Sequence, residues 1–352
     1  MNLYQEGLEA YHRGDFSQAI LLYKEALGFI EDNSNPGEKK KESLIHEKLG
    51  QAYFEIDLSA QALEHFNKSL EILNQLATNP EIEEKKLELR LLISDVKLFH
   101  SRYEGLLDEL DNIALKALEV TTNKKDRISA KAFSNIGFLL FKKGKLQSAL
   151  EYQTLARDKL ISLDEKHPDL PKIYRRLGKL HSTMAKDEES IANMKKALEI
   201  ISERYEPKHY EFITVMNDIG AWHYDNSQYQ KAREILESNL ELIRLYFSEP
   251  HSHYQVAYRY LGLIESFDGK LHHAYKYLTA AVENSKGVFG LNDPITNSCL
   301  ESLAHLYLKD GEFKKAEEII LKTLDFNIKF YGEDHEQTAK SYNKLAWLFT
   351  NQ

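Results

Sequence analysis

The 352-residue chain has a single cysteine, Cys299, so it cannot form an internal disulfide. It also lacks an N-terminal apolar stretch of the signal-peptide kind, and no apolar run approaches the length that spans a bilayer. Seven prolines and sixteen glycines are too few for long disordered tracts. These shortages predict a folded protein of a reducing compartment, the cytoplasm, with no membrane partner.

Positive charge and catalytic motifs are scarce as well. The net charge of −9 argues against nucleic-acid binding, because phosphate contacts need a basic surface. The sequence has no P-loop and no dinucleotide-binding glycine motif, and nothing around Cys299 resembles a nucleophile elbow. Most of the fourteen histidines are spread along the chain, without the convergent spacing of a zinc site. We therefore expect no catalysis, no cofactor and no metal.

What the chain does have is an internal repeat. Gly178, Gly220 and Gly262 lie 42 residues apart, and the register continues to Ala304 and Ala346. A second small residue follows twelve positions after the first one in most units, at Ala19, Ala62, Ala149, Ser190, Ala232, Ala274 and Ala316. A repeat of this length indicates a stack of similar units in which each unit packs only on its neighbours.

Each unit has the pattern of two helices. Apolar residues recur at steps of three and four, which is helical periodicity. A short polar turn separates the halves, as in Lys143-Gly144-Lys145, and an apolar or aromatic residue opens the second half, at Phe16, Leu146, Tyr229, Leu271 and Phe313. The paired small residues allow the two helices to cross closely. The sequence therefore predicts an all-α stack of antiparallel helix pairs without a sheet.

These features resemble the tetratricopeptide repeat over nearly the whole chain. The resemblance rests on Leu49-Gly50 with Tyr53 three residues later, on the Gly-Glu-Phe turn at 311–313, and on eight copies in register. It implies a right-handed superhelical solenoid of about eight repeats and a C-terminal half repeat. We expect one solenoid domain over 1–352, with less regular repeats in 1–120 and regular repeats of about 42 residues in 121–352.

The units are about eight residues longer than the usual repeat of 34, and the extra residues follow the second helix. Aromatic residues recur there at 205, 247, 289 and 331, and polar residues recur four positions later at His209, His251, Asp293 and His335. The element Tyr-Gly-Glu-Asp-His at 331–335 is similar to the longer repeats of kinesin light chains and their bacterial relatives. Lys208-His209 and Asp334-His335 are predicted to cap the helices that follow them.

The family resemblance also implies where a ligand binds. First helices line the concave groove of such a solenoid, at positions three before and one and four after the small residue. The middle of this predicted groove is basic and partly aromatic, and it should hold a protein or peptide with acidic and aromatic groups. The predicted groove residues, with two lysines one turn upstream, are Lys131, Phe138, Phe141, Lys172, Arg175, Lys179, Asn217, Tyr224 and Arg259.

The predicted function is a non-catalytic protein- or peptide-binding scaffold or adaptor. A regulatory sensor is the alternative, in which a ligand changes the superhelix and so controls an attached or separate effector such as a protease, kinase or transcription regulator. A structural alternative also stands, in which the basic residues pair with acids of neighbouring helices such as Glu211 or Asp218. The last helix either caps the stack or leads into a further domain beyond the C-terminus.

Overall fold

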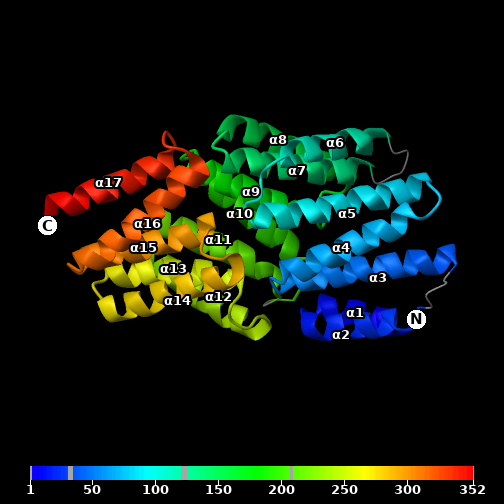
Figure 1. The fold of residues 1–352 in the computed structure, drawn as a ribbon, viewed down its shortest axis with the longest axis horizontal. Coiled ribbons are helices and arrows are strands. Elements are labelled where there is room, and N and C mark those ends of the chain that lie inside the picture. The colour runs from blue at the N-terminus through cyan, green and yellow to red at the C-terminus, as the bar shows by residue number, and fades with distance from the viewer. Residues whose placement is uncertain (1, 31–34, 120–124, 207–208, 352) are drawn as a thin grey trace. The chain divides into compact units, whose positions relative to one another are not determined.

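The computed structural model describes residues 2–30, 35–119, 125–206 and 209–351, and over these residues the chain forms seventeen α-helices and no strand (Figure 1). Odd-numbered helices are the first members of pairs and even-numbered helices are the second members, while the last helix stands alone. The helices are α1 (Asn2–His12), α2 (Phe16–Leu27), α3 (Pro36–Glu55), α4 (Ser59–Asn74), α5 (Pro80–Phe99), α6 (Leu106–Glu119), α7 (Lys125–Lys142), α8 (Leu146–Leu163), α9 (Leu170–Thr183), α10 (Asp187–Ser202), α11 (Glu211–Asp225), α12 (Tyr229–Tyr246), α13 (Ser252–Phe267), α14 (Leu271–Phe289), α15 (Pro294–Lys309), α16 (Phe313–Tyr331) and α17 (Glu336–Asn351).

The helices group into two compact units, Met1–Val215 (unit 1) and Met216–Gln352 (unit 2). Inside each unit a first helix packs on its own second helix and the second helix packs on the next pair, as for α3, α4 and α5 in unit 1 and α13, α14 and α15 in unit 2. First helices of neighbouring pairs also touch, for instance α7 and α9. The all-α class and the stack of helix pairs are confirmed. None of the described helices is long and apolar enough to cross a membrane.

The small residues lie where two helices of a pair approach closely, as predicted. A methyl group on Gly50 would lie 2.5 Å from the Phe66 ring, and one on Gly220 would lie 2.6 Å from the Leu236 side chain. The second small position lies beside the first, because the Ser190 hydroxyl donates to the carbonyl of Gly178 over 2.8 Å. A larger residue at either place overpacks the crossing.

The turn between the two helices of a pair has one backbone conformation throughout. The residue seven positions after the small residue of each first helix has a positive φ. Glycine adopts a positive φ freely, whereas residues with a side chain adopt it at a cost in free energy. Glycine occupies four of these eight turns, and the others hold larger residues, of which Ala185 has a φ of 55°. The second helix then begins at the predicted apolar or aromatic residue: Phe16, Leu146, Tyr229, Leu271 and Phe313.

Loops between pairs use the histidines as helix caps, as predicted. His209, His251 and His335 each accept a backbone N–H two residues ahead through Nδ1, over 3.2–3.3 Å. Each ring also packs against the aromatic residue four positions earlier, with Tyr205 stacked on His209 at 4.0 Å between ring centroids. These histidines are therefore committed to loop structure. Lys208, the other half of the predicted Lys208-His209 cap, lies outside the described residues.

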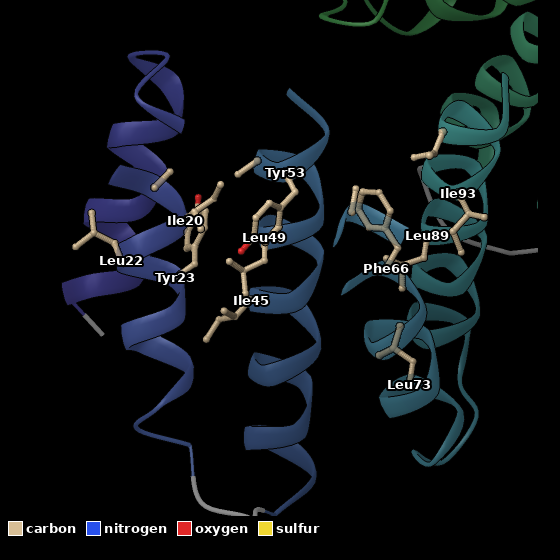
Figure 2. Close-up of a cluster of buried hydrophobic side chains, with 14 of the residues drawn as sticks. Ile20, Leu22, Tyr23, Ile45, Leu49, Tyr53, Phe66, Leu73, Leu89 and Ile93 are labelled. Atoms are coloured by element: carbon tan, nitrogen blue, oxygen red, sulfur yellow. The ribbon is translucent and has the colours of Figure 1, made fainter. Parts of the chain in front are cut away.

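The core of unit 1 shows how the repeats are held together (Figure 2). Tyr23 from α2 meets Leu49 from α3, and Phe66 from α4 meets Leu89 from α5, so that apolar side chains of consecutive helices interleave. Tyr23, Leu49, Phe66 and Leu89 have no exposed surface. Burial of such side chains is worth about 1.5–3 kcal/mol each, and it stabilises every pair through its neighbours.

Candidate functional site

Unit 1 contains a cavity of about 530 Å³ on the first-helix side of its stack. Its walls come from α3, α5, α7 and α9 together with the first residues of α11, which are the first helices of five successive pairs. The volume lies within the range of about 300–1,000 Å³ that is usual for ligand pockets. This cavity is the candidate functional site.

The lining residues follow a stripe along each first helix. In α5, where Ser94 holds the small position, the stripe comprises Lys85, Glu88, Leu91 and Asp95. Steps of three and four residues keep these side chains on one face of the helix. In α9, whose small residue is Gly178, the same positions carry Asp169 (the N-cap), Lys172 and Arg175.

Charges of alternating sign run across this wall. Lys85 pairs with Glu47 of α3 at 2.7 Å and with Glu88 at 3.0 Å. Arg127 of α7 lies 3.7 Å from Glu88 and 3.0 Å from Asp169. We call this series the charge ladder; in order along the wall it is Glu47, Lys85, Glu88, Arg127, Asp169 and Lys131, and its last pair is 3.1 Å apart.

The charge ladder fixes the ionisation of Asp169. Burial alone would raise the pKa of Asp169, but the ammonium of Lys131 and the guanidinium of Arg127 outweigh burial and lower the pKa to about 2. Asp169 is therefore a carboxylate at neutral pH. A second pair, Lys172 with Asp95 at 2.8 Å, joins α9 to α5 on the same wall.

Arg176 is the most enclosed cation of the cavity, at 9% exposure. Its guanidinium donates to the Ser134 hydroxyl and to the Asn135 side-chain oxygen, both over 2.8 Å, and it lies 4.7 Å from the centre of the Phe138 ring. Burial lowers its pKa to about 10, so it stays charged at neutral pH. Arg176 thus fixes α9 to α7 and brings a buried positive charge to the cavity wall.

The structure divides the predicted groove residues of unit 1 into two sets. Lys131, Lys172 and Arg175 line the cavity, and the first two are paired with Asp169 and Asp95, as in the structural alternative. Phe138 and Phe141 pack together at 6.4 Å against the core below Arg176, and they are not among the lining residues. Lys179 is also not among the lining residues. A role in ligand binding stays a prediction for all of them.

The remaining predicted groove residues belong to unit 2. Asn217 is buried, accepts a hydrogen bond from the Asn239 side chain over 2.8 Å and donates to the His253 carbonyl over 3.1 Å. Arg259 donates to the Ser302 hydroxyl over 2.9 Å and lies 5.2 Å from the Tyr260 ring centre. The Tyr224 ring lies 5.3 Å from that of Tyr260, so these residues form a polar and aromatic layer.

Several lining residues were missed by sequence reasoning. Glu88, Asp95, Arg127 and Asp169 lie in the stripe, yet none was named as a groove residue. Their spacing in the sequence was a signal. Each of them lies three or four residues, about one helical turn, from a position expected in the groove or from a position one turn upstream of it. Extending the helical stripe toward the N-terminal end of each first helix would have found Glu88, Arg127 and Asp169, and applying the groove register to Ser94 would have found Asp95.

Cys299 and the histidines do not form a chemical centre over the described residues. Cys299 is fully buried, as predicted, and accepts a hydrogen bond from the Gln255 amide over 3.2 Å. Burial raises the pKa of its thiol, which keeps the sulfur protonated. No group of three or more potential metal ligands gathers in the part of the chain that the structure describes.

Comparison with known proteins identifies the repeat. The tetratricopeptide repeat model matches residues 128–203, 171–245 and 295–352, which together cover half of the chain. No curated protein matches the sequence closely enough to count as a relative.

Solved structures share the fold. NprR in complex with its cognate peptide NprX superposes with a TM-score of 0.62 and 19% identity, over 84% of this chain and 81% of that chain. A Rap protein complexed with competence and sporulation factor gives a TM-score of 0.61 and 16% identity, over 89% of each chain. The Rap conjugation gene regulator of plasmid pLS20, in complex with the Phr* peptide, gives 0.61 and 16% over 81% and 73% of the two chains. The fold and the matched repeats agree, and the chain belongs to the tetratricopeptide repeat family.

Proposed function

We propose that this protein is a non-catalytic binding scaffold and that the cavity of unit 1 holds a peptide, or a peptide segment of a partner protein, of mixed charge. The observation that carries the proposal is the lining itself. Seven basic and six acidic side chains face one cavity of about 530 Å³ across five helices. A stack that only needed to hold its helices together would do so more cheaply with apolar contacts, since paired charges cost desolvation.

The charge balance modifies the ligand expected from the sequence. A uniformly acidic peptide would have to compete with Asp95 and Asp169 for Lys172 and Lys131, their present partners. A ligand that carries both signs exchanges ion pairs with both members of each pair, so that no charge is left buried without a partner. Mixed charge therefore replaces the acidic and aromatic peptide as the proposed ligand.

The fold is compatible with this proposal. NprR and the Rap conjugation gene regulator, which share the fold, were solved in complex with peptides, and a further Rap protein was solved with competence and sporulation factor. The cavity here uses the first helices, the same elements on which the family resemblance places the groove. A thiol kept protonated by burial, that of Cys299, also favours a binding role over a nucleophilic one.

Labelled octapeptides of four kinds test the proposal: alternating in charge, uniformly acidic, uniformly basic and uncharged. Fluorescence anisotropy should give the lowest Kd for the alternating peptides, and added salt should weaken their binding by screening. Equal affinity for all four kinds, or preference for the uncharged kind, would contradict the mixed-charge cavity.

A matched pair of variants tests the location. Lys172→Gln removes a cavity cation that pairs at 2.8 Å with Asp95, and its side chain is 47% exposed. Lys196→Gln on α10 removes a cation of similar exposure, 45%, that pairs at 2.9 Å with Glu199 and is not among the lining residues. We expect Lys172→Gln to raise Kd about tenfold, which corresponds to about 1.4 kcal/mol, and Lys196→Gln to leave it unchanged. Equal effects would place the ligand elsewhere.

A regulatory sensor is the second candidate function, and one observation favours it. The first repeat of unit 1 touches residues almost 200 positions away in the sequence, through His12 and His209. Such a contact can open and close, as a sensor requires, whereas a static adaptor has no need of it.

A further inference from the structure

The first helix pair of unit 1 makes a long-range contact at the start of α11. The Phe16 and Tyr210 rings meet edge to face with centroids 5.0 Å apart, and both side chains are buried. The His209 Nε2–H donates to the carbonyl of His12 over 2.8 Å. The His209 Nδ1 accepts the Glu211 N–H, so one neutral tautomer satisfies both bonds.

This contact is unusual for the end of a repeat stack. A terminal repeat packs on one neighbour only, and it is therefore the first to open. Here α1 and α2 have α3 on one side and Tyr210 on the other. The second contact joins residues 194 positions apart, so it forms only when the intervening helices of unit 1 have curved back to the first pair.

The contact is also linked to two residues that line the cavity. The Tyr11 hydroxyl donates to the Glu55 carboxylate over 3.1 Å, and the Tyr11 ring meets the Phe16 ring edge to face at 5.2 Å. Glu55 and Glu211 both line the cavity, and Glu211 directly follows Tyr210. The series Glu55, Tyr11, Phe16, Tyr210 and Glu211 therefore connects one cavity wall to another through the first repeat.

We propose that α1 and α2 act as a latch: their contact with His209 and Tyr210 closes one side of the unit 1 cavity, and release of that contact opens it. The contact includes the aromatic pair of Phe16 with Tyr210 and the hydrogen bond that the His209 ring donates to the His12 carbonyl. Such a contact is worth far less than the apolar cores of the helix pairs, so it can release while the pairs stay folded. The latch governs access to the cavity whatever ligand the cavity takes.

Hydrogen exchange tests whether the latch exists. Tyr210→Ala removes the ring that meets Phe16, and amide exchange in α1 and α2 should become at least tenfold faster. Tyr210→Phe retains that ring and should exchange like the wild type. His335→Ala is the matched loop control, because His335 also accepts a backbone N–H two residues ahead, from Gln337 over 3.2 Å, and is not among the lining residues. It should leave α1 and α2 unchanged.

Thiol labelling tests whether the latch guards the cavity. Thr214 lines the cavity from α11, and Cys299 is fully buried, so a maleimide reports mainly on the new thiol in Thr214→Cys. Adding Tyr210→Ala should speed labelling several-fold, while adding His335→Ala should not. Unchanged labelling with faster exchange in α1 would show a structural contact without a gating role, and unchanged exchange would rule out the latch itself. Neither readout uses a ligand, so both can succeed even where the peptide proposal fails.

Discussion

Units 1 and 2 are built from the same repeated helix pair, which we call the frame, but the first helices of the two units carry different side chains. Three residues before the small position, unit 1 has Glu47 in the charge ladder and Arg175 at the cavity wall. The same position in unit 2 holds Asn217 and Arg259, which hydrogen-bond to neutral groups, and Glu301, which pairs with Lys344 inside the unit at 2.9 Å. The frame tolerates this change because close backbone approach constrains only the small residues and the turn. Chemistry on the first helices is therefore where the two units have diverged.

Unit 2 has a polar network around Glu301 and Asn327. Glu301 accepts hydrogen bonds from Asn327 over 3.0 Å and from the Lys344 ammonium over 2.9 Å. Asn327 also pairs with Asn297 and with the Ser341 hydroxyl, both over 2.9 Å. A network of this kind specifies how α15, α16 and α17 stack, whereas the charge ladder of unit 1 faces a cavity.

Overpacking a helix crossing should have the largest effect in either unit. Gly50→Leu forces a side chain into the Phe66 ring, and Gly220→Leu forces one into Leu236. Each change should cost about 3 kcal/mol or more of unfolding free energy, because the nearest atoms already lie within 2.6 Å of the new Cβ. Urea unfolding followed by circular dichroism gives the loss.

Hydrogen exchange then shows whether the helix crossing tolerates a larger residue equally poorly in both units. Gly50→Leu should lower protection first in α3 and α4, and Gly220→Leu first in α11 and α12, since each repeat packs on its neighbours. Gly50→Ala is the milder comparison and should cost less. A loss below about 1 kcal/mol for either leucine variant would mean that the helices move apart easily, and the frame would then not be the shared constraint.

The charged side of unit 1 predicts a pH effect of intermediate size. Burial, and then the nearby Glu211 carboxylate, raise the pKa of Glu55 to about 7, although the Tyr11 hydroxyl and Lys172 oppose the rise. Between pH 4.5 and 7 the unfolded carboxyl has lost its proton and the folded one keeps it. Stability therefore falls as pH rises through this window, by about 1.4 kcal/mol per unit of pKa difference.

Glu55→Gln removes this cost. The unfolding free energy of the variant should exceed that of the wild type by on the order of 2–3 kcal/mol at pH 8 and match it near pH 4.5. The difference between the two proteins must be measured, because His46 acts in the opposite direction. Burial and His65 lower its pKa to about 4, so its contribution is lost as pH falls from 6.5 to 4. Glu71→Gln, on an exposed face of α4, is the control for the removal of one carboxyl.

Sequence reasoning was strongest where geometry is local. Helical spacing predicted the small residues and the helix starts at Phe16 and Phe313. The histidine caps were predicted because the first backbone N–H groups of a helix need a nearby partner. It was weakest where the outcome depends on which helices become neighbours. The pairing of Lys172 with Asp95 spans 77 residues, and the contact of Phe16 with Tyr210 depends on how far unit 1 curves. Neither leaves a periodic trace in the sequence.

The smallest predicted effect concerns the turn between paired helices, and it tests whether the frame is truly common to both units. Ala185 adopts a φ of 55°, and Ser227 in unit 2 adopts 59°. Replacing either residue with glycine should stabilise the protein by about 0.5–1 kcal/mol, because glycine takes this conformation without a steric cost. The reverse change, Gly144→Ala in unit 1 or Gly269→Ala in unit 2, should destabilise by about the same amount.

A methyl group at Gly144 or Gly269 would meet no neighbouring side chain or backbone within 4 Å, so these two changes alter only the backbone preference. Thermal melts of the four variants give the comparison. Equal and opposite shifts in both units would mean that the turns are interchangeable, and the divergence of the units would then lie on their first helices alone. A gain from Ala185→Gly without one from Ser227→Gly would instead show that the Ser227 side chain offsets its strained backbone, and part of the difference between the units would reside in the turns.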